Sequence, residues 1–298
     1  MTDVPQFSIA TPTRNALTYL KRCVGSIRGQ SGATYEHLVQ DAVSTDGTPE
    51  WLAAQSDLFS VSERDSGMYD AINRAWARSR GGILCWLNSD EQYLPGTLAQ
   101  VAAVFESDPL IEVVWGNVII VDSRGNPIAL RREIPFRSSY IANNFLYVLS
   151  CAAFFRRSLF DRGLLSFDAQ YRYSGDMDLF LRIARSGAVI RHVAAYFSLF
   201  GNDGGNLSND SVGVGEELER VRRAHGALSN PALRKLVLVG RHIERLIGGA
   251  YAKKDITYRY TTDEKPSYLE VSAKGVGGRY SVRDIEGLPS EVRVVGGS

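Results

Sequence analysis

The sequence predicts an α/β fold with a mostly parallel central sheet and helices on both faces. Short apolar runs and helix-like stretches alternate four times before residue 108, and the connections between them are short. This alternation is typical of right-handed βαβ units. After residue 108 the pattern changes, and we expect a second half that ends in a C-terminal extension of helices and a small β segment.

The first two units are read from the N-terminus. The apolar run FSIAT (7–11) predicts a strand, and apolar residues at helical spacing over 20–27 predict the helix after it. EHLVQ (36–40) predicts the second strand. Thr48 is interpreted as the N-cap of the next helix, with Pro49 as its first residue.

The next two units repeat the alternation. FSVSE (59–63) predicts a strand, and the apolar residues between 71 and 76 predict a helix. GILCWLN (82–88) predicts the fourth strand, and the helix after it is expected within 95–109. Trp86, like Trp115 and Tyr93, is interpreted as a core residue because it lies in or beside an apolar strand.

Polar residues stand at the ends of all four predicted strands. They are Thr11, Asp41, Glu63 to Asp65, and Asn88 to Asp90. In open α/β sheets the ligand crevice lies outside the carboxyl ends of the strands. The sequence therefore predicts that these side chains meet at one edge of the sheet.

The second half reads differently. A β-hairpin is expected over 111–130, about a Ser-Arg-Gly-Asn turn. A helix is expected to open near Gly175 or Asp176, and strand-like runs at 188–193 and 196–200 follow it. Two basic helical stretches are expected from about Ser211, followed by a small β segment over 258–295.

Composition limits the classes of partner. The chain has 298 residues, 44% of them hydrophobic, and a formal net charge of only +1, which argues against a nucleic-acid partner. Three cysteines without C-x-x-C spacing predict reduced, packed thiols and no zinc site. No signal peptide and no apolar run of 18 residues is visible, so we expect a cytoplasmic protein without a membrane span.

The stretch from Trp86 to Glu91, WLNSDE, joins an apolar strand to a cluster of oxygen-bearing side chains. Mg²⁺ and Mn²⁺ prefer such ligands and leave coordination positions for substrate phosphates. A plain polar turn at the end of a strand is the alternative interpretation.

Five stretches carry a family resemblance: SIATPTRN, DAVSTDGT, ERDSGMYDAINRA, LCWLNSDE and SGDMDLFLRIARSG. Their order and spacing over residues 6–208 resemble family 2 glycosyltransferases of the GT-A fold, especially bacterial members that build exopolysaccharide, O-antigen or colanic acid units. The resemblance implies a GT-A catalytic domain over 1–210, with a nucleotide-binding half at about 1–110 and an acceptor half at 111–210. Residues 211–298 would form the C-terminal extension.

The resemblance implies an inverting transfer from a nucleotide sugar, such as a UDP- or GDP-sugar, to a hydroxyl of a glycan or lipid-linked oligosaccharide. Asp176 matches the general base, and Asp90 matches the aspartate that binds Mn²⁺ or Mg²⁺, with Glu91 as a helper. Asp41 matches the residue placed against the nucleobase. The positions implied to bind the donor nucleotide are Thr11, Pro12, Arg14, Asp41, Asp65, Asn73, Asn88 and Ser89.

Three departures from the family pattern bear on these roles. Asn88 replaces the first aspartate of D-x-D, so the metal would have one firm carboxylate ligand. Ala42 and Val43 stand where VDGGS has glycines, which would tighten the nucleobase loop. The region SLFGNDGGNLS (198–208) lacks the histidine that many relatives use as a further metal ligand.

Asp176 and Asp178 lie two residues apart on the predicted helix and cannot share a face. Asp178 is spaced to pair with Arg182, which would leave Asp176 to project into the cleft, although an N-cap role is the alternative. Asp70 is likewise spaced to pair with Arg74 and is interpreted as structural.

The segment 231–248 predicts an amphipathic helix flanked by cations, which are Arg234, Lys235, Arg241 and Arg245. Such a helix can lie on an anionic membrane surface, at the inner face of the cytoplasmic membrane. Packing on its own domain, or on a second subunit of a homo-oligomer, is the alternative.

Two other functions share parts of this pattern. A sugar-phosphate nucleotidyltransferase would have a glycine-rich loop with Arg and Lys after the first strand, and ATPTRNALT has no such glycines. A non-catalytic carbohydrate-binding protein with the same fold would not need Asp90 and Asp176, and both are present.

Overall fold

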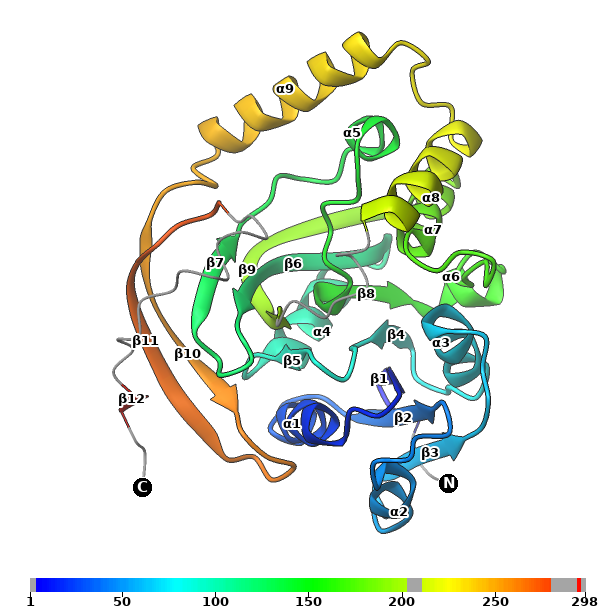
Figure 1. Cartoon of the computed structure of the whole chain (residues 1–298), viewed down its shortest axis with the longest axis vertical. Helices are drawn as coiled ribbons and strands as arrows, with labels where there is room; N and C mark the ends of the chain where they lie inside the picture. Colours follow the sequence, from blue (N-terminus) through cyan, green and yellow to red (C-terminus); the bar gives the residue numbers. More distant parts are fainter. Residues whose placement is uncertain (1–3, 203–210, 280–293, 296–298) are drawn as a thin grey trace.

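The computed structural model describes residues 4–202, 211–279 and 294–295. The helices are α1 (Leu17–Arg28), α2 (Thr48–Ala53), α3 (Met68–Ala77), α4 (Thr97–Ser107), α5 (Ser138–Asn143), α6 (Arg157–Asp161), α7 (Gly175–Arg185), α8 (Ser211–Ala224) and α9 (Pro231–Ile247). The strands are β1 (Phe7–Thr13), β2 (Tyr35–Asp41), β3 (Leu58–Ser62), β4 (Ile83–Trp86), β5 (Gln92–Tyr93), β6 (Ile111–Val121), β7 (Pro127–Arg131), β8 (Ala153–Arg156), β9 (Val189–Gly201), β10 (Lys254–Thr261), β11 (Tyr268–Val276) and β12 (Val294–Val295). The chain therefore has the predicted α/β class (Figure 1).

The main sheet has the strand order β3-β2-β1-β4-β8-β6-β9-β5, with β7 paired to β6. The first four strands run parallel, as the repeated βαβ units predict. β6 and β9 are also parallel, whereas β8 runs antiparallel to both of its neighbours. The antiparallel β8 joins the two parallel parts of the sheet, which the alternation in the first half alone does not indicate.

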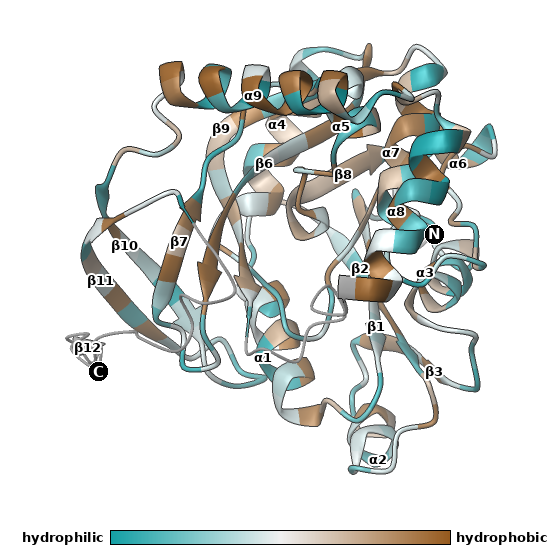
Figure 2. Ribbon diagram, turned by 45° about the horizontal axis from the view of Figure 1, so that its top comes forward, coloured by the Kyte–Doolittle hydropathy of each residue, from teal (hydrophilic) through white to brown (hydrophobic). Residues whose placement is uncertain are grey.

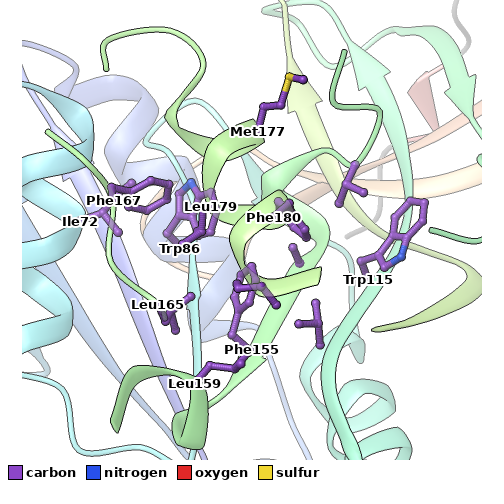
Figure 3. Packing of buried hydrophobic residues seen from close by; sticks show 14 of the residues in the cluster. Ile72, Trp86, Trp115, Phe155, Leu159, Leu165, Phe167, Met177, Leu179 and Phe180 are labelled. Carbon is purple, nitrogen blue, oxygen red and sulfur yellow. The ribbon is translucent and has the colours of Figure 1, made fainter. Parts of the chain in front are cut away.

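Alternation along the strands sends side chains to two separate cores. Ile9 and Cys85 pack on one face against α1 and α4, whereas Ala10 and Trp86 pack on the other face against α3 and α7. On the second face Trp86 stacks on Phe155, with ring centroids 5.8 Å apart (Figure 3). Because successive strand residues point to opposite faces, one strand supplies both cores.

The core predictions for the aromatic residues are confirmed. Trp86, Trp115 and Tyr93 are each no more than 2% exposed. All three cysteines are buried and unpaired. His192 packs against Trp115 with the ring centroids 4.2 Å apart, and its Nε2 bonds the side-chain oxygen of Asn117.

Two local predictions need correction. Gly47, not Thr48, is the N-cap of α2, and Thr48 is the first helical residue. Gly47 has φ of 89°, and Asp46 Oδ1 accepts from the Thr48 hydroxyl and amide, so Asp46 provides the acceptor expected of the cap. The two strand-like runs at 188–193 and 196–200 belong to the single strand β9. Shifts in the register of β9 with β6 interrupt the alternation of side chains, which is why the sequence reads as two runs.

The C-terminal hairpin of β10 and β11 lies along the edge of the molecule beside β7 (Figure 1). Tyr258, Tyr260 and Val271 share one core with Leu94 and Ile119 of the first 200 residues. The predicted β segment is thus confirmed for β10 and β11, which begin at Lys254, while residues 280–293 of that prediction lie outside the described part.

Helix α9 buries two of the four cations that were predicted to flank a membrane-facing surface. Arg241 and Arg245 are 1% and 3% exposed and face Glu133, whose carboxylate is 2.8 Å from Arg241 and 3.2 Å from Arg245. The guanidinium groups therefore hold the helix to the body of the protein instead of flanking a membrane-facing surface. In the part of the chain that the structure describes, no helix combines the length and the apolar character that a membrane span requires.

Candidate active site

The carboxyl ends of the parallel strands form one edge, as predicted. In the pairing of β1 with β2, Thr13 lies beside Asp41. In the pairing of β1 with β4, Ala10 lies beside Trp86, and the Leu87 amide donates to the Ala10 carbonyl just before Asn88. Consequently the loops that follow β1, β2 and β4 are neighbours.

Asp41 is enclosed at this edge. Its carboxylate accepts from the Ser44 amide at 3.1 Å and from the hydroxyls of Ser44 and Ser62, and the residue is 0% exposed. The structure therefore has Asp41 organising the loop that follows it.

The loop after Asp41 is held in an unusual conformation. Val43 has φ of 55° and Asn15 has φ of 48°, both in the left-handed region that favours glycine. Asn15 bonds the Ser44 hydroxyl through its amide, at 2.7 Å, and the Thr45 amide through its side chain, at 2.8 Å. Ala42 and Val43 thus stand where the resemblance implies glycines, and these contacts keep the backbone of Val43 in its left-handed conformation.

Thr11 and Pro12 are buried within β1. The Thr11 hydroxyl bonds His37 Nε2 at 2.8 Å, and burial lowers the pKa of His37 to about 3, so this ring is neutral. The Thr11 hydroxyl is therefore used inside the protein. Arg14 on the following loop is exposed, and its positive charge acts on Asp65.

The N-terminus of α3 carries two aspartates. Asp65 accepts from the Gly67 amide at 3.0 Å, and burial raises its pKa. Asp70 accepts from the Ser66 amide and lies 3.0 Å from Arg74, which confirms the predicted pair.

Asn73 of α3 bonds the backbone of Phe167 in both directions, with each contact at 2.8 Å. Phe167 stacks on Tyr69 and on Trp76 (ring centroids 4.6 and 5.5 Å apart). The side chain of Asn73 is therefore committed to fixing the segment that leads into α7, where Asp176 lies.

The turn after β4 separates its two acids. Glu91 is 1% exposed, accepts from the Asn88 amide at 2.7 Å, and has its pKa raised to about 8 by burial and by the charge of Asp90. Asp90, in contrast, borders a small pocket together with Tyr19, Asn202 and Tyr260. Glu91, which the resemblance implies as a second metal ligand, therefore has a carboxyl that faces the interior of the protein.

The oxygens of this turn suit a hard cation. The buried Asn88 Oδ1 and Glu91 Oε1 have no hydrogen-bond partner, and Asp90 adds a carboxylate on the open side. Among residues 4–202, 211–279 and 294–295, no three His, Cys, Asp or Glu side chains cluster in a way that could hold a metal ion. A cation here would need oxygens from a ligand such as a diphosphate.

Gly201 provides the close packing that positions Asp90. A Cβ at Gly201 would lie 2.5 Å from the backbone oxygen of Asp90. We expect Gly201→Ala to displace the Asp90 turn and to raise the Kd of a nucleotide-sugar donor roughly tenfold, because small misplacements of binding groups are costly. Calorimetric titration measures this Kd. Gly187→Ala is a control for the added methyl group, since a Cβ there meets nothing within 4 Å, although its φ of 83° adds strain. Equal donor affinity in the Gly201 variant would contradict the positioning role.

Asp176 lies in the first turn of α7. Its Oδ1 accepts from the Met177 amide at 2.8 Å and is 3.4 Å from the Tyr69 hydroxyl, which also accepts from the Asp176 amide. A Cβ at Gly175 would meet the Tyr69 ring at 2.7 Å, so α3 and α7 touch at this point. Burial raises the pKa of Asp176 to about 6, a suitable value for a base near neutral pH.

Two further contacts position α7. Asp178 lies 2.7 Å from Arg182, which confirms that prediction, and its other oxygen is 2.8 Å from His225 of α8. Glu217 of α8 accepts from the backbone amides of residues 172, 173 and 174 at 2.8, 2.8 and 3.0 Å. The carboxylate of Glu217 therefore holds in place, through these three hydrogen bonds, the loop that immediately precedes α7 and Asp176.

Sequence reasoning missed Tyr69, Gly201 and Glu217. Tyr69 lies inside the quoted motif ERDSGMYDAINRA, so the motif could have suggested it. Gly201 ends an apolar strand, where a glycine can indicate close backbone approach. Glu217 lies in the charged run EELER, which carries no distinguishing signal.

These sites and this fold define a class of protein. The structure resembles Staphylococcus aureus TarS 1–349 in complex with UDP-GlcNAc (TM-score 0.58, 19% identity, 82% of this chain and 75% of that one). It also resembles the mannosyltransferase PcManGT from Pyrobaculum calidifontis in complex with GDP-Man and Mn²⁺ (TM-score 0.56, 19% identity, 81% and 70%). The chain spans 45% of another TarS chain to which it is similar. The fold is that of the GT-A glycosyltransferases.

Sequence comparison gives the family. The model for glycosyl transferase family 2 matches residues 8–164. A PGL/p-HBAD biosynthesis glycosyltransferase of Mycobacterium bovis is 30% identical over 219 residues, which is 70% of this chain and 81% of the relative. The teichuronic acid biosynthesis glycosyltransferase TuaG of Bacillus subtilis, a putative assignment in its own name, is 32% identical over 94 residues, covering 30% and 37%. The chain belongs to glycosyltransferase family 2 and is a glycosyltransferase, which decides against the nucleotidyltransferase alternative.

Proposed function

We propose that this enzyme transfers a sugar, with inversion, from a nucleoside diphosphate donor to a hydroxyl of a glycan or lipid-linked glycan. The proposal rests on the environment of Asp176. This carboxyl lies at the start of α7, its pKa is raised to about 6, and it contacts the Tyr69 hydroxyl of α3. Residues 1–110 would bind the nucleotide, and residues 111–210 would bind the acceptor. The reaction would take place in the cytoplasm, at the inner face of the membrane.

In this mechanism Asp176 accepts the proton of the acceptor hydroxyl as its oxygen attacks the anomeric carbon. The bond from that carbon to the diphosphate oxygen breaks, and its electron pair leaves with the nucleoside diphosphate. Attack from the side opposite the leaving group inverts the configuration. The proton transfer contributes about 10² to 10⁴ in rate.

The diphosphate needs neutralisation as it leaves. Asp90, with the Asn88 side-chain oxygen, would hold Mn²⁺ or Mg²⁺, and such an ion stabilises the negative charge that develops on the departing phosphates. The backbone around Thr11 and Pro12, together with Arg14, Asp65 and Ser89, would line the rest of the nucleotide site. Asp41 and Asn73 would act by holding its loops.

The relatives guide the choice of substrates. The neighbours crystallised with UDP-GlcNAc and with GDP-Man and Mn²⁺ support a nucleoside diphosphate sugar and a divalent cation. The names of the sequence relatives, which concern PGL/p-HBAD and teichuronic acid biosynthesis, support a bacterial surface glycan or glycolipid as the acceptor.

The proposal is tested with a panel of UDP-, GDP- and dTDP-sugars, with and without Mn²⁺. We expect at least one donor to release its nucleoside diphosphate faster when Mn²⁺ is present, since a divalent cation stabilises the charge on the departing phosphates. Proton NMR of the product then gives the anomeric configuration. A product that retains the donor configuration, or nucleotide release that ignores metal across the whole panel, would contradict the proposal.

A further inference from the structure

Helix α9 exposes a stripe of hydrophobic side chains and buries Arg241 and Arg245 on its inner face. Its outer face is a stripe of residues spaced by three or four, so they point the same way. These residues are Leu233, Leu236, Val239, Ile243, Leu246 and Ile247, which are 45%, 66%, 51%, 52%, 64% and 82% exposed. Figure 2 shows α9 along one edge of the molecule with hydrophobic segments on its ribbon. A contiguous stripe of this kind marks an interaction surface.

Polar contacts on the inner face fix this orientation. Glu133 bonds Arg241, with 2.8 Å between their atoms, and also lies close to Arg131 and Arg245. Arg241 additionally stacks over the ring of Tyr147, 4.7 Å from its centroid. Turning the apolar stripe inward would separate Arg241 and Arg245 from Glu133 and leave the buried Glu133 carboxylate without these partners, which is strongly unfavourable. The outer face therefore remains outward in the folded monomer.

Most of the exposed charged residues of α9 and of the segment that follows it are lysines. The only acid of α9, Glu244, lies on the inner side, where it accepts from Arg137 and from the Tyr140 hydroxyl. The exposed residues beside the stripe and just after its C-terminal end include Lys235, Lys253 and Lys254, with Asp255 as the neighbouring acid. An apolar stripe with lysines at both ends complements a surface that combines hydrocarbon with negative charge.

We propose that the outer face of α9 binds the surface of a bilayer that contains anionic lipids, with the helix lying in the plane of the interface. A second copy of this chain fits less well. Pairing two identical stripes about a twofold axis would bring lysines near lysines, since both ends of the stripe carry the same sign of charge. The inference does not depend on the proposed transfer reaction, because lipid binding is measured without turnover.

The first test is sedimentation of the full chain with vesicles of equal parts phosphatidylcholine and phosphatidylglycerol. We expect the wild-type protein to sediment with them and to do so less at high salt. The vesicle partition coefficient of the triple variant Leu236→Gln, Ile243→Gln, Ile247→Gln should be lower than that of the wild type by roughly tenfold or more. Each change removes apolar area from the interface with the membrane. Gln is a good helix former, so α9 should persist.

Matched control variants distinguish binding through α9 from non-specific hydrophobic adsorption to vesicles. Phe59→Gln, Leu110→Gln and Val189→Gln remove three exposed apolar side chains elsewhere, and this variant should sediment like the wild type. The variant Lys235→Gln, Lys253→Gln, Lys254→Gln should lose the preference for anionic over purely phosphatidylcholine vesicles. Equal vesicle binding by the wild type and the α9 triple variant would overturn the proposal.

A second measurement does not depend on how the triple variant folds. Ile243→Cys places one accessible thiol on the stripe, since the three native cysteines are buried. A polarity-sensitive fluorophore on this thiol should shift its emission to the blue when anionic vesicles are added. No shift would overturn the proposal. So would concentration-dependent dimerisation of the wild type that the α9 triple variant abolishes, together with absence of vesicle binding.

Discussion

Replacing Asp176 by Asn should lower kcat about 10²- to 10⁴-fold while the Kd for the donor nucleotide stays within a factor of about two. Asn keeps the shape of the side chain and its contact with the Met177 amide, but it cannot accept a proton from the acceptor. Single-turnover kinetics at saturating donor, together with calorimetric titration, measure the two quantities. Loss of donor binding along with kcat would show that Asp176 holds the nucleotide instead.

The pH dependence gives an independent check. Burial raises the pKa of Asp176 to about 6, and a general base is active only when ionised. The wild-type kcat/KM should therefore fall with decreasing pH below about 6, and the residual activity of Asp176→Asn should not follow this profile. Tyr69→Phe removes a hydroxyl that contacts the carboxylate, and it should move the midpoint of the profile to higher pH.

Stability should change in the opposite direction to activity. Because the pKa of Asp176 is higher in the folded protein than its usual value near 3.8, ionising the carboxyl costs stability as the pH rises from about 4 to about 6. The Asn variant lacks that cost. The difference in free energy of unfolding, variant minus wild type, should thus increase across this interval and stay level above it. Denaturation at several pH values measures it.

Asp90→Asn should weaken Mn²⁺-dependent donor binding roughly a hundredfold, since the ion would lose the carboxylate ligand that borders the pocket beside the β4 turn. Donor binding without metal should change little. Calorimetric titration of a nucleoside diphosphate in the presence and absence of Mn²⁺ measures both.

Glu91→Gln is the matched control, because Glu91 is buried and its pKa of about 8 makes it largely neutral already. This variant should keep the Mn²⁺ dependence of the wild type. If Glu91→Gln abolishes the dependence and Asp90→Asn does not, the two acids have exchanged roles.

The sequence predicted the first half of the fold well for a physical reason. Each strand of the parallel part is a short apolar run. The helix after it carries the chain back, so that the next strand starts at the same edge of the sheet. Local periodicity and chain order therefore determine this arrangement. Strand β8 was not predicted, because an antiparallel strand inserted between β4 and β6 depends on contacts far apart in the chain. The same applies to Glu217, whose partners at residues 172–174 lie more than forty positions away.

The sequence indicates which positions stand at the candidate site, and the structure adds the contacts that their side chains make. Asp176 lies beside Tyr69 of α3, and the Asp90 turn follows β4 and packs against Gly201 of β9. The roles of both acids remain proposals. Asp41 and Asn73 were expected to meet the nucleotide, yet their polar atoms bond Ser44 and Phe167 of the protein itself. Motif spacing identifies an edge of the sheet, whereas the direction of each side chain depends on neighbours that spacing does not contain.

The orientation of α9 shows the limit of amphipathic patterns. The periodicity correctly predicted one apolar and one cationic face, but it does not say which face meets the protein. The buried carboxylate of Glu133 determines the orientation of α9, because it forms an ion pair with Arg241 on the cationic face.

The C-terminal hairpin reaches back to the Asp90 pocket through Tyr260, while the family model ends at residue 164. A segment beyond the residues that the family model matches therefore forms part of the wall of the pocket that Asp90 borders. In a lineage that keeps its nucleotide half constant, exchange of such a hairpin would give new acceptor preferences without rebuilding the catalytic machinery. We expect chimaeras that trade only this hairpin between relatives to retain their donor and to differ in the glycan they extend.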